Sequence, residues 1–116
     1  MRVLLVDDEK KFTTMLAKRL SLRGVDADYA YTGKDAIAKV ETSSYDVAIL
    51  DVKMPGIGGL ELKRHLKELA PEMKFIFLTG HGSKTDFETA SLEVARYLAK
   101  PIQIDELIRI LKEVAG

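Results

Sequence analysis

The sequence contains no cysteine among its 116 residues. That absence excludes disulfide frameworks, thiolate metal sites and cysteine nucleophiles. A surplus of charge is also missing, because 18 Lys and Arg residues balance 18 Asp and Glu residues. Nothing therefore indicates binding to nucleic acid or to an anionic membrane. No apolar run approaches the ~20 residues that span a bilayer, and Met1-Arg2 leads into an apolar strand rather than a signal peptide. We expect one cytoplasmic globular domain covering residues 1–116.

Short apolar runs alternate along the chain with stretches of helical periodicity. The runs predict strands at 3–6, 25–29, 47–50, 75–78 and 97–99. Apolar spacing predicts helices around 12–20, 36–40, 62–69, 87–94 and 104–115. Alternation of five strands with five helices indicates a parallel sheet covered on both faces, because each crossover needs a helix. The expected fold is α/β, a doubly wound three-layer (βα)5 sandwich.

The spacing also predicts which side of each helix is buried. In the helix at 12–20 the apolar stripe consists of Phe12, Met15, Leu16 and Leu20, and Gly24 follows it as a C-cap. In the helix at 62–69 the stripe consists of Leu62, Leu66 and Leu69, and the helix must end before Pro71.

Four of the five strands are followed by a polar residue capable of chemistry. Asp7 and Asp8 follow the first strand, Asp51 the third, Thr79 the fourth and Lys100 the fifth. Taken singly, Asp7, Asp8 and Thr79 could be helix N-caps, and Lys100 could be a solvated charge. Capping does not explain Asp51, which precedes a glycine-rich loop rather than a helix. Only the flavodoxin-like strand order 2-1-3-4-5 places the first and third strands side by side, with their ends ~4.8 Å apart.

Three carboxylates at that distance would repel one another unless a cation joined them. Oxygen-only ligands suit Mg²⁺, which we expect at Asp8 and Asp51 with Asp7 acting through water. A carboxylate beside Mg²⁺ can attack phosphorus and form an aspartyl phosphate. Asp51 is the expected acceptor because it is alone at its strand end. Lys100 would neutralise a phosphoryl oxygen, and the Thr79 hydroxyl would donate a hydrogen bond to another.

At these residues the chain resembles the receiver domain of two-component response regulators. The motifs that carry the resemblance are Val3-Leu4-Leu5-Val6-Asp7-Asp8-Glu9, Asp51-Val52-Lys53-Met54-Pro55-Gly56 with Gly59-Leu60, Leu78-Thr79-Gly80-His81-Gly82, and Tyr97-Leu98-Ala99-Lys100-Pro101. Each motif alone is weak, but their order and spacing are specific, and together they cover essentially the whole sequence.

The resemblance implies a phosphoacceptor signalling domain rather than an enzyme. Asp51 would take a phosphoryl group from a sensor histidine kinase or a histidine phosphotransfer protein. Asp8, Asp51 and the backbone carbonyl of Lys53 would hold Mg²⁺. Thr79 and Tyr97 would form a switch pair, and the bond between Lys100 and Pro101 would be cis. The switch would change the face of helix four, strand five and helix five, which would control an output domain or a docking partner, or support a weak homodimer.

Lys53 and His81 lie two positions beyond Asp51 and Thr79. We expect both side chains to adjust the rate of phosphoryl hydrolysis, although His81 could equally be an exposed loop residue without a role. The sequence departs from the family pattern at Glu93-Val94-Ala95, where a Gly-Ala pair is usual, and at Gly58, where an acidic residue is common. The stretch from Thr79 to Lys100 is also about one residue shorter than the family pattern.

Two other functions share part of this pattern. A haloacid-dehalogenase-like phosphatase also uses an aspartate nucleophile and Mg²⁺, but it needs a second Asp where this chain has Lys53. A pseudo-receiver keeps the fold and signals without phosphate, which the intact Asp8, Asp51, Thr79 and Lys100 argue against. A P-loop is excluded because no G-x-x-x-x-G-K-[ST] occurs, and the glycines do not complete G-x-G-x-x-G.

Overall fold

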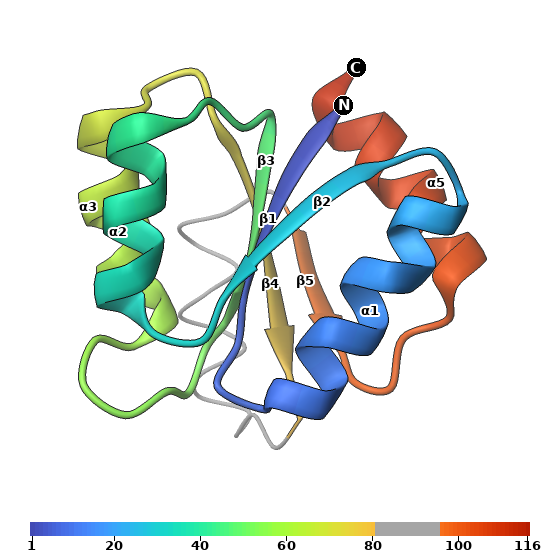
Figure 1. Ribbon diagram of the computed structural model, residues 1–116, viewed down its shortest axis with the longest axis horizontal. Helices are drawn as coiled ribbons and strands as arrows, with labels where there is room; N and C mark the ends of the chain where they lie inside the picture. Colours follow the sequence, from blue (N-terminus) through green and yellow to red (C-terminus); the bar gives the residue numbers. More distant parts are fainter. Residues whose placement is uncertain (81–95) are drawn as a thin grey trace.

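The computed structural model describes residues 1–80 and 96–116 of the chain. Its strands are β1 (Arg2–Val6), β2 (Asp26–Ala30), β3 (Val47–Asp51), β4 (Lys74–Thr79) and β5 (Arg96–Ala99). They form one parallel sheet in the order β2-β1-β3-β4-β5 (Figure 1). The predicted strand order is therefore confirmed.

Helices cover both faces of the sheet. They are α1 (Lys10–Leu22), α2 (Gly33–Thr42), α3 (Gly59–Leu69) and α5 (Ile104–Ala115). Helices α2 and α3 lie on one face, and α1 and α5 lie on the other (Figure 1). The helix predicted around 87–94 and the departure at Glu93-Val94-Ala95 fall outside the described residues. None of the helices in the described part of the chain is long and apolar enough to cross a membrane.

The two apolar layers meet at the central strands. Every residue of β3 is buried, and β1 is buried from its second residue onward. Alternate residues point to opposite faces, so Ala48 and Leu50 pack toward α2 and α3, while Val47 and Ile49 pack toward α1 and α5. Burial on both faces accounts for the uninterrupted apolar runs in the sequence.

Helix α1 corrects one predicted burial. Met15 is 53% exposed, although its spacing placed it on the apolar stripe. Thr13 is buried in its place, and its hydroxyl shares its single proton between the Asp7 carbonyl oxygen at 3.1 Å and the Glu9 carbonyl oxygen at 2.8 Å. A satisfied hydroxyl can occupy a core position at little cost, and hydropathy alone does not identify it. At the end of α3, Leu69 is likewise 45% exposed.

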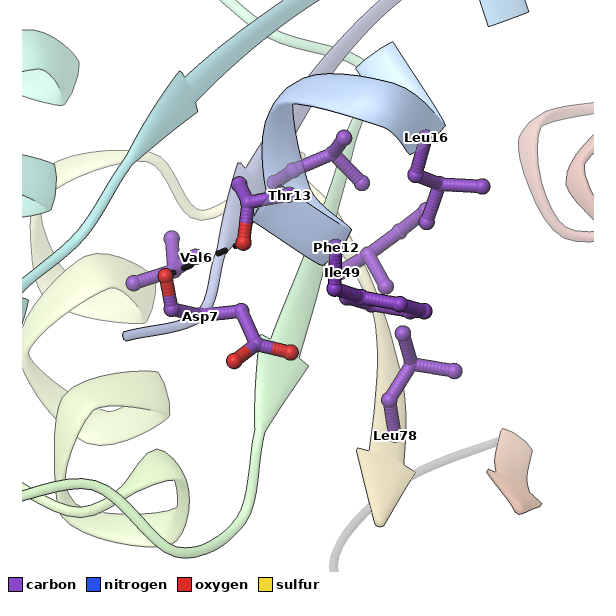
Figure 2. Close-up of a pocket in the computed structure, with 8 residues that line it drawn as sticks. Val6, Asp7, Phe12, Thr13, Leu16, Ile49 and Leu78 are labelled. Atoms are coloured by element: carbon purple, nitrogen blue, oxygen red, sulfur yellow. Dashed lines mark hydrogen bonds between the residues drawn. The ribbon is translucent and has the colours of Figure 1, made fainter. Parts of the chain in front are cut away.

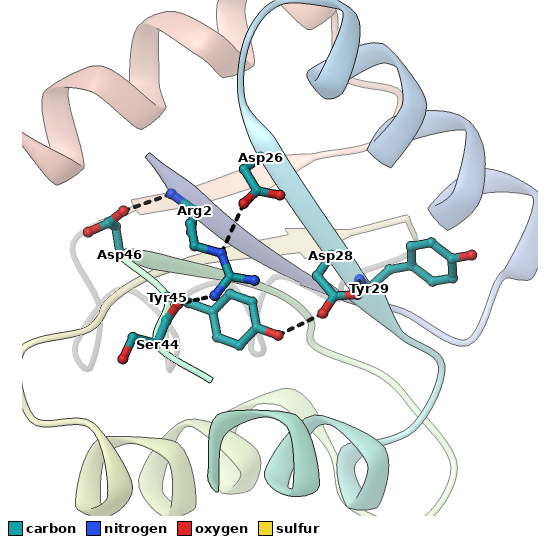
Figure 3. Close-up of polar contacts among 7 residues, drawn as sticks. All are labelled: Arg2, Asp26, Asp28, Tyr29, Ser44, Tyr45 and Asp46. Atoms are coloured by element: carbon teal, nitrogen blue, oxygen red, sulfur yellow. Dashed lines mark hydrogen bonds and ion pairs between the residues drawn. The ribbon is translucent and has the colours of Figure 1, made fainter. Parts of the chain in front are cut away.

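A network of polar contacts closes the amino end of the sheet (Figure 3). The Arg2 side chain pairs with Asp26 at 3.0 Å, donates to the Ser44 carbonyl oxygen at 2.9 Å, and lies 4.8 Å from the centre of the Tyr45 ring. The Tyr45 hydroxyl donates to Asp28 at 2.7 Å. The network also includes Lys39, which pairs with Asp28 at 2.8 Å, and Asp46, which accepts from the Arg2 amide at 2.7 Å.

Candidate functional site

The carboxyl ends of β1 and β3 bring three aspartates together. Val6 pairs with Leu50 in the sheet register, so the next residues along, Asp7 and Asp51, follow neighbouring positions. One carboxylate oxygen from each of Asp7, Asp8 and Asp51 lies within 4.8 Å of the others. Asp7 and Asp51 are buried, whereas Asp8 is exposed. The predicted meeting of the three carboxylates is thus present in the structure.

Burial and neighbouring charge change the acidity of Asp51. Desolvation is the largest cause, and together with repulsion from Asp7 and Asp8 it raises the pKa of Asp51 to about 7. The Lys100 charge and a hydrogen bond from the Lys53 amide act in the opposite direction without cancelling the rise. A divalent cation would relieve this repulsion directly, so the cluster fits an ion that binds carboxylate oxygens.

Lys100 supplies the opposing charge. Its ammonium pairs with Asp7 at 2.6 Å and with Glu9 at 2.7 Å. Its side chain is only 10% exposed, and the Asp7 side chain with which it pairs is buried as well. Burial alone would lower the pKa of Lys100, but the hydrogen bonds to Asp7 and Glu9 raise it on balance. The lysine is therefore held in its charged form.

Local backbone contacts position the cluster. The Glu9 amide donates to the Asp7 carboxylate at 3.0 Å, which fixes that side chain at the start of α1. The N-cap of α1 is Glu9, so neither Asp7 nor Asp8 serves as the cap, and the capping explanation of these aspartates was wrong. Gly59, the first residue of α3, lies against the end of β3. A Cβ atom there would be 2.4 Å from the Asp51 carbonyl oxygen, so only glycine permits α3 to approach β3 this closely. The Gly59 amide donates to the Val52 carbonyl oxygen at 3.0 Å and closes the loop between them.

Thr79 and Tyr97 lie on the adjoining strands. Thr79 is buried at the end of β4, and Tyr97 is partly buried on β5. Tyr97 pairs with Phe77 in the register, and their ring centres are 6.4 Å apart. Because Thr79 is two residues beyond Phe77, strand alternation assigns Thr79 and Tyr97 to the same face of the sheet. The bond between Lys100 and Pro101 is cis, as the family resemblance implied.

The structure does not place two of the predicted site residues as expected, and two neighbours of Lys100 were not predicted. Lys53 is exposed, and its amide rather than its carbonyl contacts Asp51 here. His81 lies outside the described residues. Sequence reasoning placed Phe12 only on an apolar stripe and Glu9 only in a family motif, and it predicted no contact of either with Lys100. The only sequence signal for Glu9 was its place directly after the aspartate pair.

Comparisons with known proteins agree with this geometry. The family described as response regulator receiver domain matches residues 3–112. The transcriptional regulatory protein TcrA of Mycobacterium tuberculosis is 36% identical over 116 residues, which cover 98% of this chain and 46% of TcrA. The transcriptional regulatory protein TrcR of the same organism is 37% identical over 112 residues, which cover 96% of this chain and 44% of TrcR. The chain thus spans a little under half the length of these relatives.

Solved structures share the whole fold. A CheY-like response regulator receiver domain protein from Methanospirillum hungatei superposes with a TM-score of 0.88 and 29% identity, covering 97% of this chain and 90% of the other. The response regulator TrrA from Thermotoga maritima, solved in complex with Mg²⁺-BeF, gives a TM-score of 0.84 and 34% identity, covering 97% of this chain and 96% of the other.

Proposed function

The chain belongs to the response regulator receiver domain family, and from this premise we propose that Asp51 accepts a phosphoryl group as the chemical step of signalling. The observation that carries the proposal is the cluster itself. Three carboxylates within 4.8 Å of one another face a single buried ammonium. Such an arrangement costs stability in the free protein and becomes favourable when a cation and a phosphoryl group join it.

The proposed donor is a phosphohistidine on a sensor kinase or a phosphotransfer protein. An Asp51 carboxylate oxygen attacks the phosphorus, the P–N bond breaks, and the imidazole nitrogen leaves with the bonding electron pair. Lys100 donates to one phosphoryl oxygen and Thr79 to another, so both neutralise charge that grows during transfer. The proximity of Lys100 to the cluster supports its part in this step.

Mg²⁺ is the proposed cofactor. Asp8 and Asp51 would hold it together with the Lys53 carbonyl, and Asp7 would contact it through water. When bound, the ion neutralises the carboxylates and orients the phosphoryl oxygens. The all-oxygen donor set and the raised pKa of Asp51, about 7 without a cation, support this assignment. The Mg²⁺-BeF complex of TrrA, 34% identical to this chain, also supports it.

Signal output is proposed to run through Thr79 and Tyr97. A new phosphate adds about −1.5 to −2 charge at the end of the sheet, which draws the Thr79 hydroxyl toward it and lets Tyr97 turn inward. The surface formed by β5, α5 and the helix predicted around 87–94, which lies outside the described residues, would then contact an output domain, a docking protein or a second copy of the chain. Relatives that are about twice as long and named as transcriptional regulators support an attached output domain. Lys53 and His81 are proposed to tune hydrolysis of the phosphate.

Intact mass spectrometry tests the proposal. The protein is incubated with Mg²⁺ and phosphoramidate or acetyl phosphate, and we expect one added phosphoryl unit that Asp51→Asn abolishes. Asp35→Asn, an exposed carboxylate in the first turn of α2, is the matched control and retains the added mass. No added mass in the wild type would favour a pseudo-receiver, and rapid catalytic turnover of the donor would favour a phosphatase.

A further inference from the structure

The Lys100 ammonium has a third neighbour besides its two carboxylates. Its Nζ atom lies 4.6 Å from the centre of the Phe12 ring. An ammonium over an aromatic face is attracted to the ring's quadrupole, and the attraction grows when the cation is withdrawn from water. Lys100 meets that condition because its side chain is only 10% exposed.

The three neighbours differ in how firmly they are held. The Asp7 side chain is 4% exposed and belongs to the buried end of β1. The Glu9 side chain is 62% exposed, so its ion pair with Lys100 is screened by water and weak. Phe12 is partly buried in the first turn of α1. Asp7 and Phe12 are thus the two less exposed neighbours of the lysine.

The core keeps the Phe12 ring in place. Figure 2 shows the ring beside Leu16 of α1 and Leu78 of β4, which line the same small cavity as the Asp7 side chain. Leu16 and Leu78 are almost fully buried. A ring packed in this way has little freedom to move, whereas the four-carbon stem of a lysine has several rotatable bonds.

We propose that Phe12 is a positioning residue for phosphoryl transfer, whose ring face holds the Lys100 ammonium beside Asp7 and within reach of a phosphate on Asp51. This inference rests on the proposed function. No ion pair within 4.0 Å joins Lys100 to Asp51 in the described part of the chain, so their attraction acts over a longer distance, and the short contacts of the ammonium are with Asp7, Glu9 and the Phe12 ring. An aliphatic residue at position 12 would fill the same space without attracting a cation, which distinguishes this role from simple packing.

The test compares Phe12→Leu with Leu16→Val. Each substitution shortens a side chain in the same apolar cluster, but only the first removes the aromatic face next to Lys100. Two quantities are measured in the full chain, namely the proton chemical shifts of the Lys100 side chain by NMR in the absence of phosphate, and the rate of phosphorylation by phosphoramidate with Mg²⁺. Far-UV circular dichroism checks folding, and Phe12→Met replaces Phe12→Leu if the latter does not fold.

We expect the Lys100 methylene protons nearest the ring to be shifted upfield in the wild type and in Leu16→Val, and to lose that shift in Phe12→Leu. Phosphorylation of Phe12→Leu should be about fivefold slower, and that of Leu16→Val close to wild type. Absence of the upfield shift in the wild type, an unchanged rate in Phe12→Leu, or an equal loss in Leu16→Val would overturn the inference. Failure of the wild type to accept phosphate would instead overturn the proposed function, while the chemical shifts would still decide whether the ring holds the lysine.

Discussion

The two ends of the sheet each gather three aspartates, but they balance the charge differently. At the amino end, Asp26 and Asp28 pair with different cations, and Asp28 also accepts from the Tyr45 hydroxyl. At the carboxyl end, the only ion pairs that the described residues give the cluster come from Lys100, which is shared between Asp7 and Glu9.

The acidities follow this difference. Burial alone would raise the pKa of Asp28, yet hydrogen bonds from Lys39, Tyr45 and the Tyr29 amide lower it overall. The same arrangement raises the pKa of Tyr45 to about 12, through burial and the adjacent Asp28. The pKa of Asp51 is raised to about 7 because burial and repulsion prevail there. Hydrogen bonds thus outweigh burial for Asp28 at the amino end, whereas burial and repulsion outweigh the Lys100 charge and the Lys53 amide for Asp51 at the carboxyl end.

Removing one lysine from each end should give the largest contrast. Lys100→Met leaves the buried Asp7 carboxylate without its cation, so we expect about 3 kcal/mol of lost unfolding free energy and phosphorylation slower by about 100-fold. Lys39→Met breaks a half-exposed pair and should cost no more than about 1 kcal/mol. Urea denaturation and intact mass measure the two effects. Equal losses in the two variants would contradict the comparison.

Neutralising one aspartate at each end should change stability in opposite directions. The folded pKa of Asp51 is about 7, above its ordinary value of 3.8. Its contribution to stability is therefore present at low pH and is lost as pH rises through about 7. Without divalent cations at pH 8, we expect Asp51→Asn to raise the unfolding free energy by roughly 2 kcal/mol.

Asp28→Asn should instead lower stability at pH 8. The folded pKa of Asp28 is below its ordinary value, so its contribution is present at high pH and is lost on acidification through the folded pKa. Thermal unfolding at pH 5 and pH 8 measures both variants. A stabilising Asp28→Asn, or a destabilising Asp51→Asn, would show that the ends do not differ as described.

The affinity for Mg²⁺ should depend on the ionisation of Asp51 at the carboxyl end and not on that of Asp28 at the amino end. Below a pH of about 7 a proton competes with the ion for Asp51, so we expect affinity to fall by up to about tenfold per pH unit. Isothermal titration calorimetry between pH 5.5 and 8.5 follows this change. Asp28→Asn should leave the profile as it is, and a flat profile in the wild type would contradict the raised pKa of Asp51.

The smallest effect should come from Glu9→Gln. This change removes a negative charge that lies 2.7 Å from Lys100 but is largely exposed. Because phosphoramidate and acetyl phosphate are anions, we expect phosphorylation to become about two- to threefold faster. Unfolding free energy should change by less than about 1 kcal/mol. A slower reaction would mean that Glu9 assists the transfer rather than opposing the approach of the donor.

The sequence was sufficient to predict the sheet and the meeting of the aspartates. Buried parallel strands appear in the sequence as uninterrupted apolar runs. The carboxyl ends of parallel strands lie at the same edge of the sheet, and this does not depend on how the helices pack. The neighbours of Lys100 could not be predicted in this way, because they depend on the direction in which each side chain leaves α1. The same limit explains why the burial of Met15 was predicted wrongly. Its spacing suited burial, but Thr13, with its hydroxyl bonded to the Asp7 carbonyl oxygen, is the buried residue.

Gly59 has a consequence for how this domain can vary. Its amide ties the start of α3 to the Val52 carbonyl oxygen, and its missing side chain lets that helix rest against the backbone of Asp51. The loop of residues 53–58 is therefore closed by the hydrogen bond between its flanking residues, Val52 and Gly59, which does not involve the side chains of the loop. Insertions or exchanges near Pro55 would alter the exposed surface of the loop while leaving the contacts of Gly59 with Asp51 and Val52 in place. The surface beside the three aspartates can in this way vary while the seat of α3 on β3 stays constant.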